Sequence, residues 1–302
     1  MYDLIIIGSG PAGLSAAVYG KRAGLNLLVL EKNPMSGGQV LNTYEVDNYL
    51  GMPGADGFDM GMQFRQHADK LGVEFREVLA TSIEDRGDSK VIHTEEGILE
   101  TKAVILAAGA VHASLGVPGE VEYAGKGVSY CATCDGAFYR GRTVAVIGGG
   151  DVALEDAIYL ARTCEKVYLI HRRDVLRGAM VLQEELKALP NVEILYSHTV
   201  EEIQGGDTVE GILVKNGKTG DTFTLPVSGV FVAVGIRPGT ELVRDLVACD
   251  EGGYVVADET GATDVPGIYV AGDVRKKPLR QIVTAVADGA NAAVAAGQYS
   301  RG

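Results

Sequence analysis

Two glycine-rich turns, each placed between an apolar run and a helical pattern, constrain the fold of this 302-residue chain most. The first turn, at residues 8–13, follows an apolar run over residues 3–8 and precedes small and apolar residues at helical spacing up to Arg22. A second apolar run over residues 26–31 ends in Glu31. A buried strand, a tight turn, a helix and a second strand that ends in an acid are the fingerprint of a dinucleotide-binding βαβ unit.

Each glycine of the first turn has a physical role in such a unit. Gly8 makes the tight turn, Gly10 lets the backbone approach a pyrophosphate, and Gly13 permits close packing of the helix on the strand. The helix N-terminus faces the phosphates, and Glu31 can accept hydrogen bonds from ribose hydroxyls. A glycine-rich turn without a ligand is the alternative, which the matching strand, helix and acid disfavour.

The second half of the chain repeats this plan. Its predicted strand, turn, helix and following strand cover residues 143–147, 148–153, 154–162 and 166–170. At the position of Glu31, the second half carries His171, Arg172 and Arg173, with Arg177 one helical turn later. A carboxylate repels a 2′-phosphate, whereas guanidinium groups bind one bidentately. The first turn therefore suits FAD and the second suits NADPH, although a solvated basic surface is the alternative interpretation of the second cluster.

A pair of cysteines, Cys131 and Cys134, lies just before the second turn and is followed directly by Asp135. Two thiols at this spacing can close a disulfide ring that opens and closes with two electrons, and Asp135 can move the accompanying protons. A structural disulfide or half of a zinc site is the alternative. Cys164 and Cys249 stand alone, and the 5 histidines show no paired ligand spacing. The sequence therefore predicts a redox role and no metal site.

Three further apolar runs cover residues 104–109, 230–235 and 267–273. The first two end in glycine, and the third ends in Gly272 followed by Asp273. The first two close the two halves, after a meander predicted by short alternating runs over residues 73–101. The third has no glycine-rich turn of its own, so we expect the chain to return to the first domain. Asp273 would then lie at the carboxyl end of a parallel strand, where such sheets bind ligands. A last helix is predicted from about Gln281.

The long connection over residues 35–54 reads as a loop, and a loop of this length in a compact domain is usually functional. Composition excludes other classes. The net charge of −13 argues against nucleic acid and anionic membranes as partners. No apolar stretch reaches the about 18–20 residues that a spanning helix needs. The N-terminus shows no leader pattern and the cysteines form no secreted framework, so the sequence predicts a cytoplasmic protein.

Together these motifs resemble the bacterial-type low-molecular-weight thioredoxin reductases over almost the whole chain. The matching segments are residues 7–13, 37–39, 131–136, 148–151, 171–173, 271–274 and 280–281. The resemblance implies an α/β fold of two Rossmann-like dinucleotide-binding domains with three-layer ββα architecture. The FAD domain would be discontinuous, over residues 1–114 and 244–302, and residues 115–243 would form the NADPH domain that carries the cysteine pair.

The resemblance also implies the site residues. FAD would be bound by Gly8, Ser9, Gly10, Pro11, Ala12, Gly13, Glu31, Lys32, Gly38, Gln39, Val40, Thr43, Asn48, Ala108, Gly109, Gly272, Asp273, Arg280, Gln281 and Ile282. NADPH would be bound by Gly148, Gly150, Asp151, Val152, Ala153, Glu155, His171, Arg172, Arg173, Arg177 and Ile236. Val152 replaces a small hydroxyl residue usual in the family, and residues 178–181 lack its usual basic residue, changes that could weaken NADPH binding or broaden it towards NADH.

The family mechanism, carried over to this sequence, runs from NADPH to the flavin and then to the Cys131–Cys134 disulfide. Cys134 would be the flavin-side thiol, Asp135 the acid and base, and Cys131 the nucleophile towards the disulfide of thioredoxin. The resemblance implies a homodimer and a rotating NADPH domain, with hinges that we expect near residues 110–117 and 238–246.

Three alternatives remain open at the level of sequence. The same fold could reduce another disulfide carrier, glutaredoxin-like or peroxidase-linked, or run a small dithiol in the oxidising direction. It could take electrons from a different donor, such as ferredoxin. A third interpretation is a redox sensor whose disulfide switches conformation without turnover.

Overall fold

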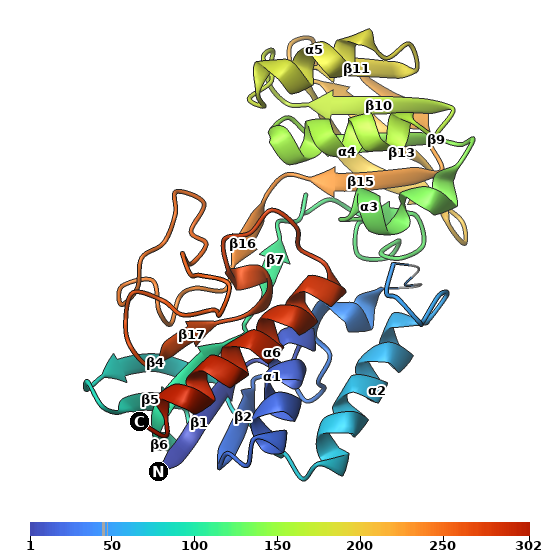
Figure 1. Cartoon of the computed structure of the whole chain (residues 1–302). Coiled ribbons are helices and arrows are strands. Elements are labelled where there is room, and N and C mark those ends of the chain that lie inside the picture. The colour runs from blue at the N-terminus through green and yellow to red at the C-terminus, as the bar shows by residue number, and fades with distance from the viewer. Residues whose placement is uncertain (44–45, 47) are drawn as a thin grey trace. The chain divides into compact units, whose positions relative to one another are not determined.

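A computed structural model describes residues 1–43, 46 and 48–302 of the chain. Part of the predicted loop over residues 35–54 therefore lies outside the described residues. The chain divides into two compact units, which are described separately below (Figure 1). Unit 1 comprises Met1–Val111 and Arg237–Gly302, and unit 2 comprises His112–Ile236.

Unit 1 is built on a seven-stranded sheet in the order β3-β2-β1-β6-β5-β4, with β17 added beside β6. Its elements are β1 (Tyr2–Ile7), α1 (Pro11–Arg22), β2 (Leu27–Glu31), η1 (Gly38–Asn42), α2 (Gly57–Lys70), β3 (Glu74–Glu77), β4 (Ala80–Asp85), β5 (Lys90–Thr94), β6 (Gly97–Leu106), β17 (Ile268–Val270), η3 (Gly272–Val274) and α6 (Ile282–Tyr299). The crossings β7 (Ala110–His112) and β16 (Ile236–Pro238) pair with each other.

The return of the chain to unit 1 positions the first candidate site. β17 pairs in parallel with β6, which pairs in parallel with β1. Since the carboxyl ends of parallel strands lie at one edge of a sheet, the turn after β1 and the turn after β17 share that edge. The meander prediction is right for β4, β5 and β6, which pair antiparallel, and wrong for β3, which pairs in parallel with β2 after the crossover through α2.

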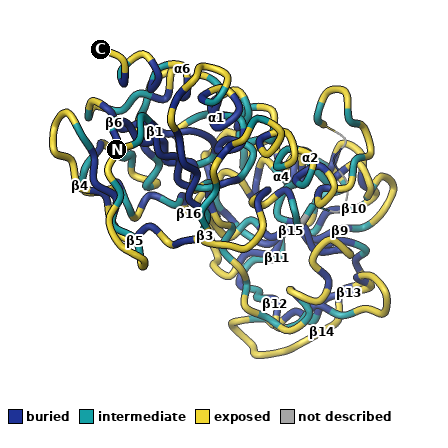
Figure 2. Tube along the Cα trace, turned by 90° about the horizontal axis from the view of Figure 1, so that it is seen from below, coloured by how far each residue is buried: buried dark blue, intermediate teal, exposed yellow. Residues whose placement is uncertain are grey.

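The core of unit 1 has two sides. On one side, α1 and α6 pack on the sheet and on each other (Figure 1). A Cβ atom at Gly289 of α6 would lie 2.0 Å from the carbonyl oxygen of Ala12 in α1, so only glycine allows this approach. On the other side, Val243, Val247, Val255 and Val274 join the apolar cluster that covers the sheet. Strands β1 and β6 are mostly buried, as Figure 2 shows.

Unit 2 repeats the architecture with a five-stranded parallel sheet in the order β11-β10-β9-β15-β8. Its elements are β8 (Val128–Ser129), α3 (Ala132–Asp135), η2 (Gly136–Tyr139), β9 (Thr143–Gly148), α4 (Asp151–Ala161), β10 (Lys166–His171), α5 (Met180–Ala188), β11 (Val192–Tyr196), β12 (His198–Gly205), β13 (Val209–Asn216), β14 (Thr222–Pro226) and β15 (Gly229–Ala233). One apolar cluster joins the sheet to α4 and α5, and a second joins it to the antiparallel sheet β12-β13-β14. The predicted α/β class with Rossmann-like units is confirmed.

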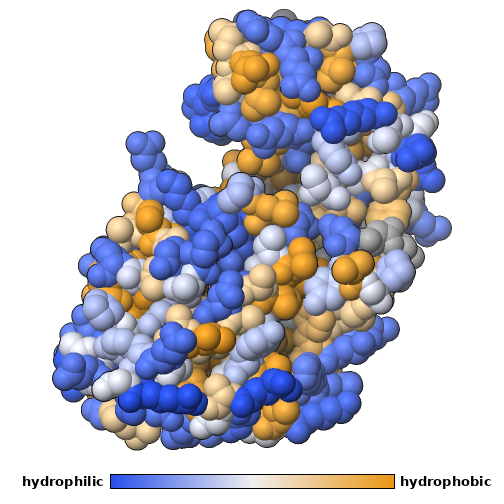
Figure 3. Space-filling model, viewed as in Figure 1, coloured by the Kyte–Doolittle hydropathy of each residue, from blue (hydrophilic) through white to orange (hydrophobic). Residues whose placement is uncertain are grey.

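On the face in Figure 3, hydrophilic side chains predominate and apolar ones are scattered among them. In the described part of the chain, no helix combines the length and the apolar character needed to cross a membrane.

Candidate functional site

The turn between β1 and α1 has room for a ligand where the sequence predicts a pyrophosphate. Gly8 has φ +103°, and a Cβ atom at Gly13 would lie 1.9 Å from the Gly8 carbonyl oxygen. Gly10 is different, because the nearest atom to a Cβ there is Cα of Gly38 at 3.9 Å. Gly8 and Gly13 shape the turn, whereas Gly10 leaves its backbone open beside Gly38.

Glu31, at the end of β2, ties this turn in place. Its Oε2 accepts from the backbone N–H of Ser9 at 2.9 Å and from the Ser9 hydroxyl at 2.7 Å. Its Oε1 accepts from the backbone and side-chain nitrogens of Asn33, both at 3.0 Å. All four lone-pair sites of the carboxylate are therefore engaged, so a ribose hydroxyl would replace one of the exposed bonds to Asn33. Lys32, between them, is exposed.

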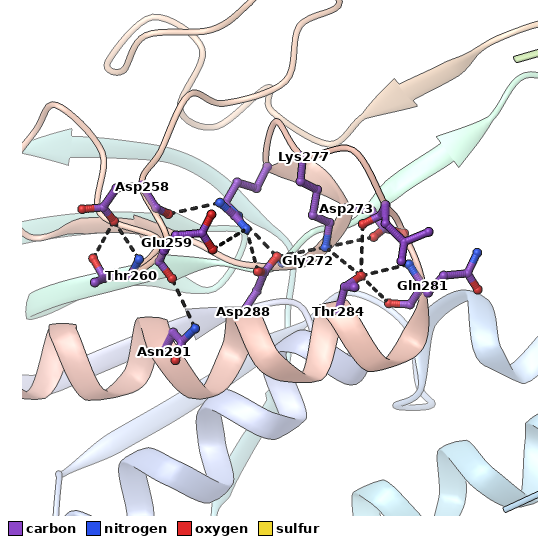
Figure 4. A network of polar contacts seen from close by, with 12 residues as sticks. Asp258, Glu259, Thr260, Gly272, Asp273, Lys277, Gln281, Thr284, Asp288 and Asn291 are labelled. Carbon is purple, nitrogen blue, oxygen red and sulfur yellow. Dashed lines mark hydrogen bonds and ion pairs between the residues drawn. The ribbon is translucent and has the colours of Figure 1, made fainter. Parts of the chain in front are cut away.

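The turn after β17 contains the clearest sign of a missing polar partner in unit 1. In the part of the chain that the structure describes, Asp273 Oδ1 and Arg280 Nε are the buried side-chain atoms without a hydrogen-bond partner. Lys277 Nζ lies 3.6 Å from Asp273 Oδ1, and burial raises the pKa of Asp273 against the opposing charges of Lys277 and Arg280 (Figure 4). The Arg280 guanidinium stacks on Tyr254 at 3.9 Å. Buried polar atoms are almost always satisfied, so these two atoms point to a polar ligand.

The remaining predicted FAD residues of unit 1 lie in α1, in η1 and the segment after it, just after β6, in η3, and at the start of α6. Gln39 donates to the carbonyl oxygen of Ala110, and the Asn48 side chain donates to Gln281 Oε1 at 2.9 Å. Gln281 is the N-cap residue of α6, so this bond connects the 35–54 segment to the start of that helix. The other predicted residues of this group that the chain places here are Pro11, Ala12, Val40, Thr43, Ala108, Gly109, Gly272 and Ile282.

Beneath the turn between β9 and α4 lies the buried side chain of His171, one of the predicted NADPH residues. His171 is 4% exposed, its Nε2 pairs with the carbonyl oxygen of Val175 at 3.0 Å, and burial lowers its pKa. A Cβ atom at Gly149 would lie 2.2 Å from His171 Nδ1. The missing side chain of Gly149 makes room for the ring under the turn, so His171 does not share the exposure of the arginines that follow it, and its predicted contact with NADPH stays a prediction. The exposed cations are Arg172, Arg173 and Arg177.

The segment after β10 folds back on this turn. Arg177 N–H donates to the Gly149 carbonyl oxygen at 2.7 Å, and Asp151 Oδ1 accepts from the backbone N–H of Ala179 at 2.7 Å. Nothing lies within 4 Å of a Cβ atom at Gly150, so the backbone there is open to a ligand. Val152 and Glu155 are exposed on α4, Ala153 is buried, and Ile236 is half-buried at the end of unit 2.

The two cysteines form a disulfide with a Cα–Cα distance of 5.3 Å. Cys131 is the N-cap of α3, and its Sγ accepts from the Cys134 backbone N–H at 3.2 Å and lies 3.4 Å from Thr133 Oγ1. Ala132 is fully buried in the core under α4, which anchors the ring. A donor directed at a sulfur stabilises a thiolate there, so this backbone N–H would favour a thiolate at Cys131.

Asp135 lies directly beside this disulfide and is held by Ser129. The Ser129 hydroxyl lies 2.6 Å from Asp135 Oδ2, and the Cys131 backbone N–H donates to Ser129 Oγ at 3.1 Å. Burial raises the pKa of Asp135, and the hydrogen bond from Ser129 opposes that rise. A carboxyl group in this state can both donate and accept a proton. Sequence reasoning missed Ser129, although its position at the end of a short strand just before the cysteines was a usable signal.

The chain as a whole matches a family of disulfide oxidoreductases that use a pyridine nucleotide. Residues 2–289 match the pyridine nucleotide-disulphide oxidoreductase family. The chain is 43% identical over 300 residues to the thioredoxin reductase of Listeria innocua, covering 99% of this chain and 94% of that one. The chain belongs to the thioredoxin reductase family of these oxidoreductases, as its resemblance in sequence had indicated.

Solved structures agree with this assignment. Thioredoxin reductase from Streptococcus pyogenes is 44% identical, with a TM-score of 0.95 over 99% of this chain and 98% of that one. Thioredoxin reductase from Lactococcus lactis is 43% identical, with a TM-score of 0.67 over 100% of this chain and 99% of that one.

Proposed function

We propose that this chain is an NADPH-dependent thioredoxin-disulfide reductase that passes electrons through FAD and the Cys131–Cys134 dithiol to thioredoxin. The observation that carries the proposal is the arrangement around the disulfide, where Cys131 Sγ accepts a backbone hydrogen bond and Asp135 lies next to the ring. The same unit contains an open glycine turn followed by exposed arginines. A dithiol, a proton carrier and a 2′-phosphate site within one unit suit a reductase better than a structural disulfide.

Unit 1 has the residues to hold FAD. The pyrophosphate would lie at the open backbone of Gly10 and the N-terminus of α1, and the ribose near Glu31. The unpartnered Asp273 Oδ1 and Arg280 Nε would bond to polar groups of the cofactor. Bound flavin supplies the two-electron chemistry that links a nicotinamide to a disulfide. We assign residues 1–114 and 244–302 to this domain, close to the observed unit boundaries.

Unit 2 has the residues to hold NADPH. The pyrophosphate would lie over Gly148–Gly150 at the N-terminus of α4, where a Cβ atom at Gly150 would meet nothing within 4 Å. Arg172, Arg173 and Arg177 are the exposed groups that would bind a 2′-phosphate, and the buried His171 would support the turn from beneath.

The dithiol chemistry balances within this chain and its substrate. Reduction of the Cys131–Cys134 bond takes up two electrons and two protons and leaves two thiols. The Cys131 thiolate attacks one sulfur of the thioredoxin disulfide, whose other sulfur leaves as a thiolate. Cys134 then attacks Cys131 Sγ, which re-forms the ring and releases the second thioredoxin sulfur, while Asp135 exchanges protons with the departing thiolate.

A turnover assay with matched cysteine variants tests the proposal. With NADPH and purified thioredoxin, we expect Cys131→Ser and Cys134→Ser each to abolish thioredoxin reduction. Cys249→Ser is the control, because its thiol lies half-buried in unit 1. Thioredoxin reduction by Cys131→Ser would contradict the mechanism. Turnover with a glutaredoxin-like protein but not with thioredoxin would favour the alternative carrier.

We also propose that the chain forms a homodimer, as the family resemblance implies, and that it works in the cytoplasm, as the cysteine pattern of the sequence predicts. Light scattering of the purified protein should give twice the mass of one chain. A mass of one chain at assay concentrations would contradict the dimer.

A further inference from the structure

One buried carboxylate on α6, that of Asp288, accepts hydrogen bonds from several residues of the segment that follows β17. Asp288 is 6% exposed, and its Oδ2 accepts from the Gly272 backbone N–H at 3.1 Å and from Lys277 Nζ at 2.9 Å (Figure 4). Arg275 donates to the same carboxylate from Nε at 3.4 Å and from a terminal nitrogen at 3.0 Å. A single side chain therefore receives donors from three residues of the six-residue stretch that contains Asp273.

The charges of this network balance only when Asp273 is included. Arg275 and Lys277 are two buried cations, and Asp288 is one buried anion. Glu259 also faces Arg275, at 3.9 Å, but it is 94% exposed and therefore screened by solvent. The second anion is the half-buried Asp273, whose Oδ1 lies 3.6 Å from Lys277 Nζ. Because buried charges need partners, Asp288 and Asp273 hold Lys277 between them.

The network also reaches the start of α6. Lys277 Nζ lies 3.4 Å from Thr284 Oγ1, and Thr284 forms a reciprocal capping box with Gln281. Arg280, whose Nε is buried and unpartnered, directly precedes Gln281. The ammonium group of Lys277, which lies beside Asp273, is thus bonded to the helix end that carries the candidate flavin residues Arg280, Gln281 and Ile282.

We propose that Asp288 is a positioning residue for the flavin site. Through Gly272 and Lys277 it fixes the turn that carries Asp273, whose Oδ1 has no hydrogen-bond donor within this chain and is left to accept one from the ligand. Asp288 does not touch the cofactor in this proposal; it acts through Asp273. The inference rests on the proposed binding of FAD by unit 1. The competing explanation is an ion cluster that only stabilises the unit.

A double-mutant cycle on cofactor binding separates the two explanations. The full-length apoprotein is titrated with FAD, and the quenching of flavin fluorescence gives Kd for the wild type, Asp288→Asn, Asp273→Asn and the double variant. We expect Asp288→Asn to raise Kd about tenfold or more, equivalent to about 1.4 kcal/mol. In the Asp273→Asn background, the same substitution should add little. Glu259→Gln, which removes the exposed carboxylate near Arg275, should leave Kd unchanged.

Each other result overturns a stated claim. An unchanged Kd in Asp288→Asn, or effects of the two substitutions that simply add, would make Asp288 a structural residue. If Asp288→Asn does not fold, Lys277→Met removes the bridging cation, and its effect on Kd must shrink in the Asp273→Asn background for the proposal to stand. A wild-type protein that does not bind FAD would sink the proposed function itself, and this inference with it.

Discussion

The two glycine-rich turns occupy the same place in the same scaffold, yet they differ at the residue that closes each turn. In unit 1, Ser9 donates two hydrogen bonds to Glu31 at the end of β2. In unit 2, Gly149 leaves a space that the ring of His171 fills at the end of β10. Both contacts hold the turn against the second strand. The contacting side chain is a carboxylate in unit 1 and an imidazole in unit 2, so the group beneath the ligand site differs between the two units.

The helices that follow the turns differ as well. A Cβ atom at Gly13 of α1 would lie 1.9 Å from a backbone oxygen, whereas Ala153 occupies the equivalent place in α4 and is fully buried. α1 carries the buried Ala16 where α4 carries Asp156. The first turn is packed to the limit that backbone atoms permit, and the second has the looser spacing that an alanine requires. The two units thus differ where the helix packs on the strand, at Gly13 and Ala153. Both keep an open backbone at the glycine that precedes the helix, Gly10 in unit 1 and Gly150 in unit 2.

The largest expected effect is on packing. Gly13→Ala should lower the free energy of unfolding by about 3 kcal/mol, because its Cβ overlaps the Gly8 carbonyl and the backbone must shift. Ala153→Gly should cost only about 1 kcal/mol, the usual cost of glycine within a helix. Urea unfolding of both variants measures the difference, and equal losses would show that the two turns are packed alike.

The next effect is on the choice of nucleotide. Arg172→Ala combined with Arg173→Ala should raise KM for NADPH about a hundredfold and leave KM for NADH nearly unchanged, since bidentate bonds to the 2′-phosphate are lost. Steady-state kinetics with both nucleotides measure this. Lys218→Ala, an exposed cation of the same unit, is the control. An equal loss with NADH would mean that the arginines do not contact the 2′-phosphate.

A smaller effect concerns pH. Burial and the charge of Glu155 raise the pKa of Asp156 to about 7, above its ordinary value of 3.8. The native state therefore binds more protons than the unfolded chain between about pH 4 and pH 7, and this group's contribution to stability falls as the pH rises through that window. Asp156→Asn should gain about 2 kcal/mol over the wild type on going from about pH 4 to pH 6.

Chemical unfolding at several pH values measures this gain. Asp174→Asn, which changes an exposed carboxylate of unit 2, is the control. A constant difference between Asp156→Asn and the wild type across the range would show that Asp156 is ionised in the native state throughout.

The smallest effect concerns the Glu31 carboxylate that accepts hydrogen bonds from Ser9. Glu31→Gln keeps an acceptor for Ser9 but loses one for Asn33 and for a ribose hydroxyl. We expect Kd for FAD to rise about tenfold, the loss of one charge-assisted hydrogen bond, with no change in KM for NADPH. Fluorescence titration measures the first quantity. A change in KM for NADPH alone would reverse the assignment of the two turns.

Much of the fold was predictable because short-range patterns determine it. Apolar runs ending in glycine gave the strands β1, β9 and β15, and the run at residues 267–273 without its own turn indicated the return of β17 to unit 1. The parallel pairing of β3 was not predictable from alternation, since its partner β2 is set by the crossover through α2.

The supporting residues of the sites were harder to foresee. Asp288 looks like a polar interruption in a small-residue helix, and its partners meet it only after β17 has placed their turn beside α6. The inward rotation of His171 depends on the space at Gly149, which the charge pattern of residues 171–173 does not reveal. Sequence spacing located the glycine-rich turns, but it did not reveal the residues that hold them in place.

The central claim is that one chain joins an FAD site, an NADPH site and a dithiol, and an anaerobic titration tests it most directly. The purified flavin-loaded protein is mixed with NADPH, then separately with NADH, while the flavin absorbance is followed. We expect rapid bleaching by NADPH, slower bleaching by NADH, and return of the yellow colour on adding oxidised thioredoxin. Bleaching by dithionite but by neither nucleotide would contradict the account, and would leave Arg172 and Arg173 as surface charges on a protein with a different electron donor.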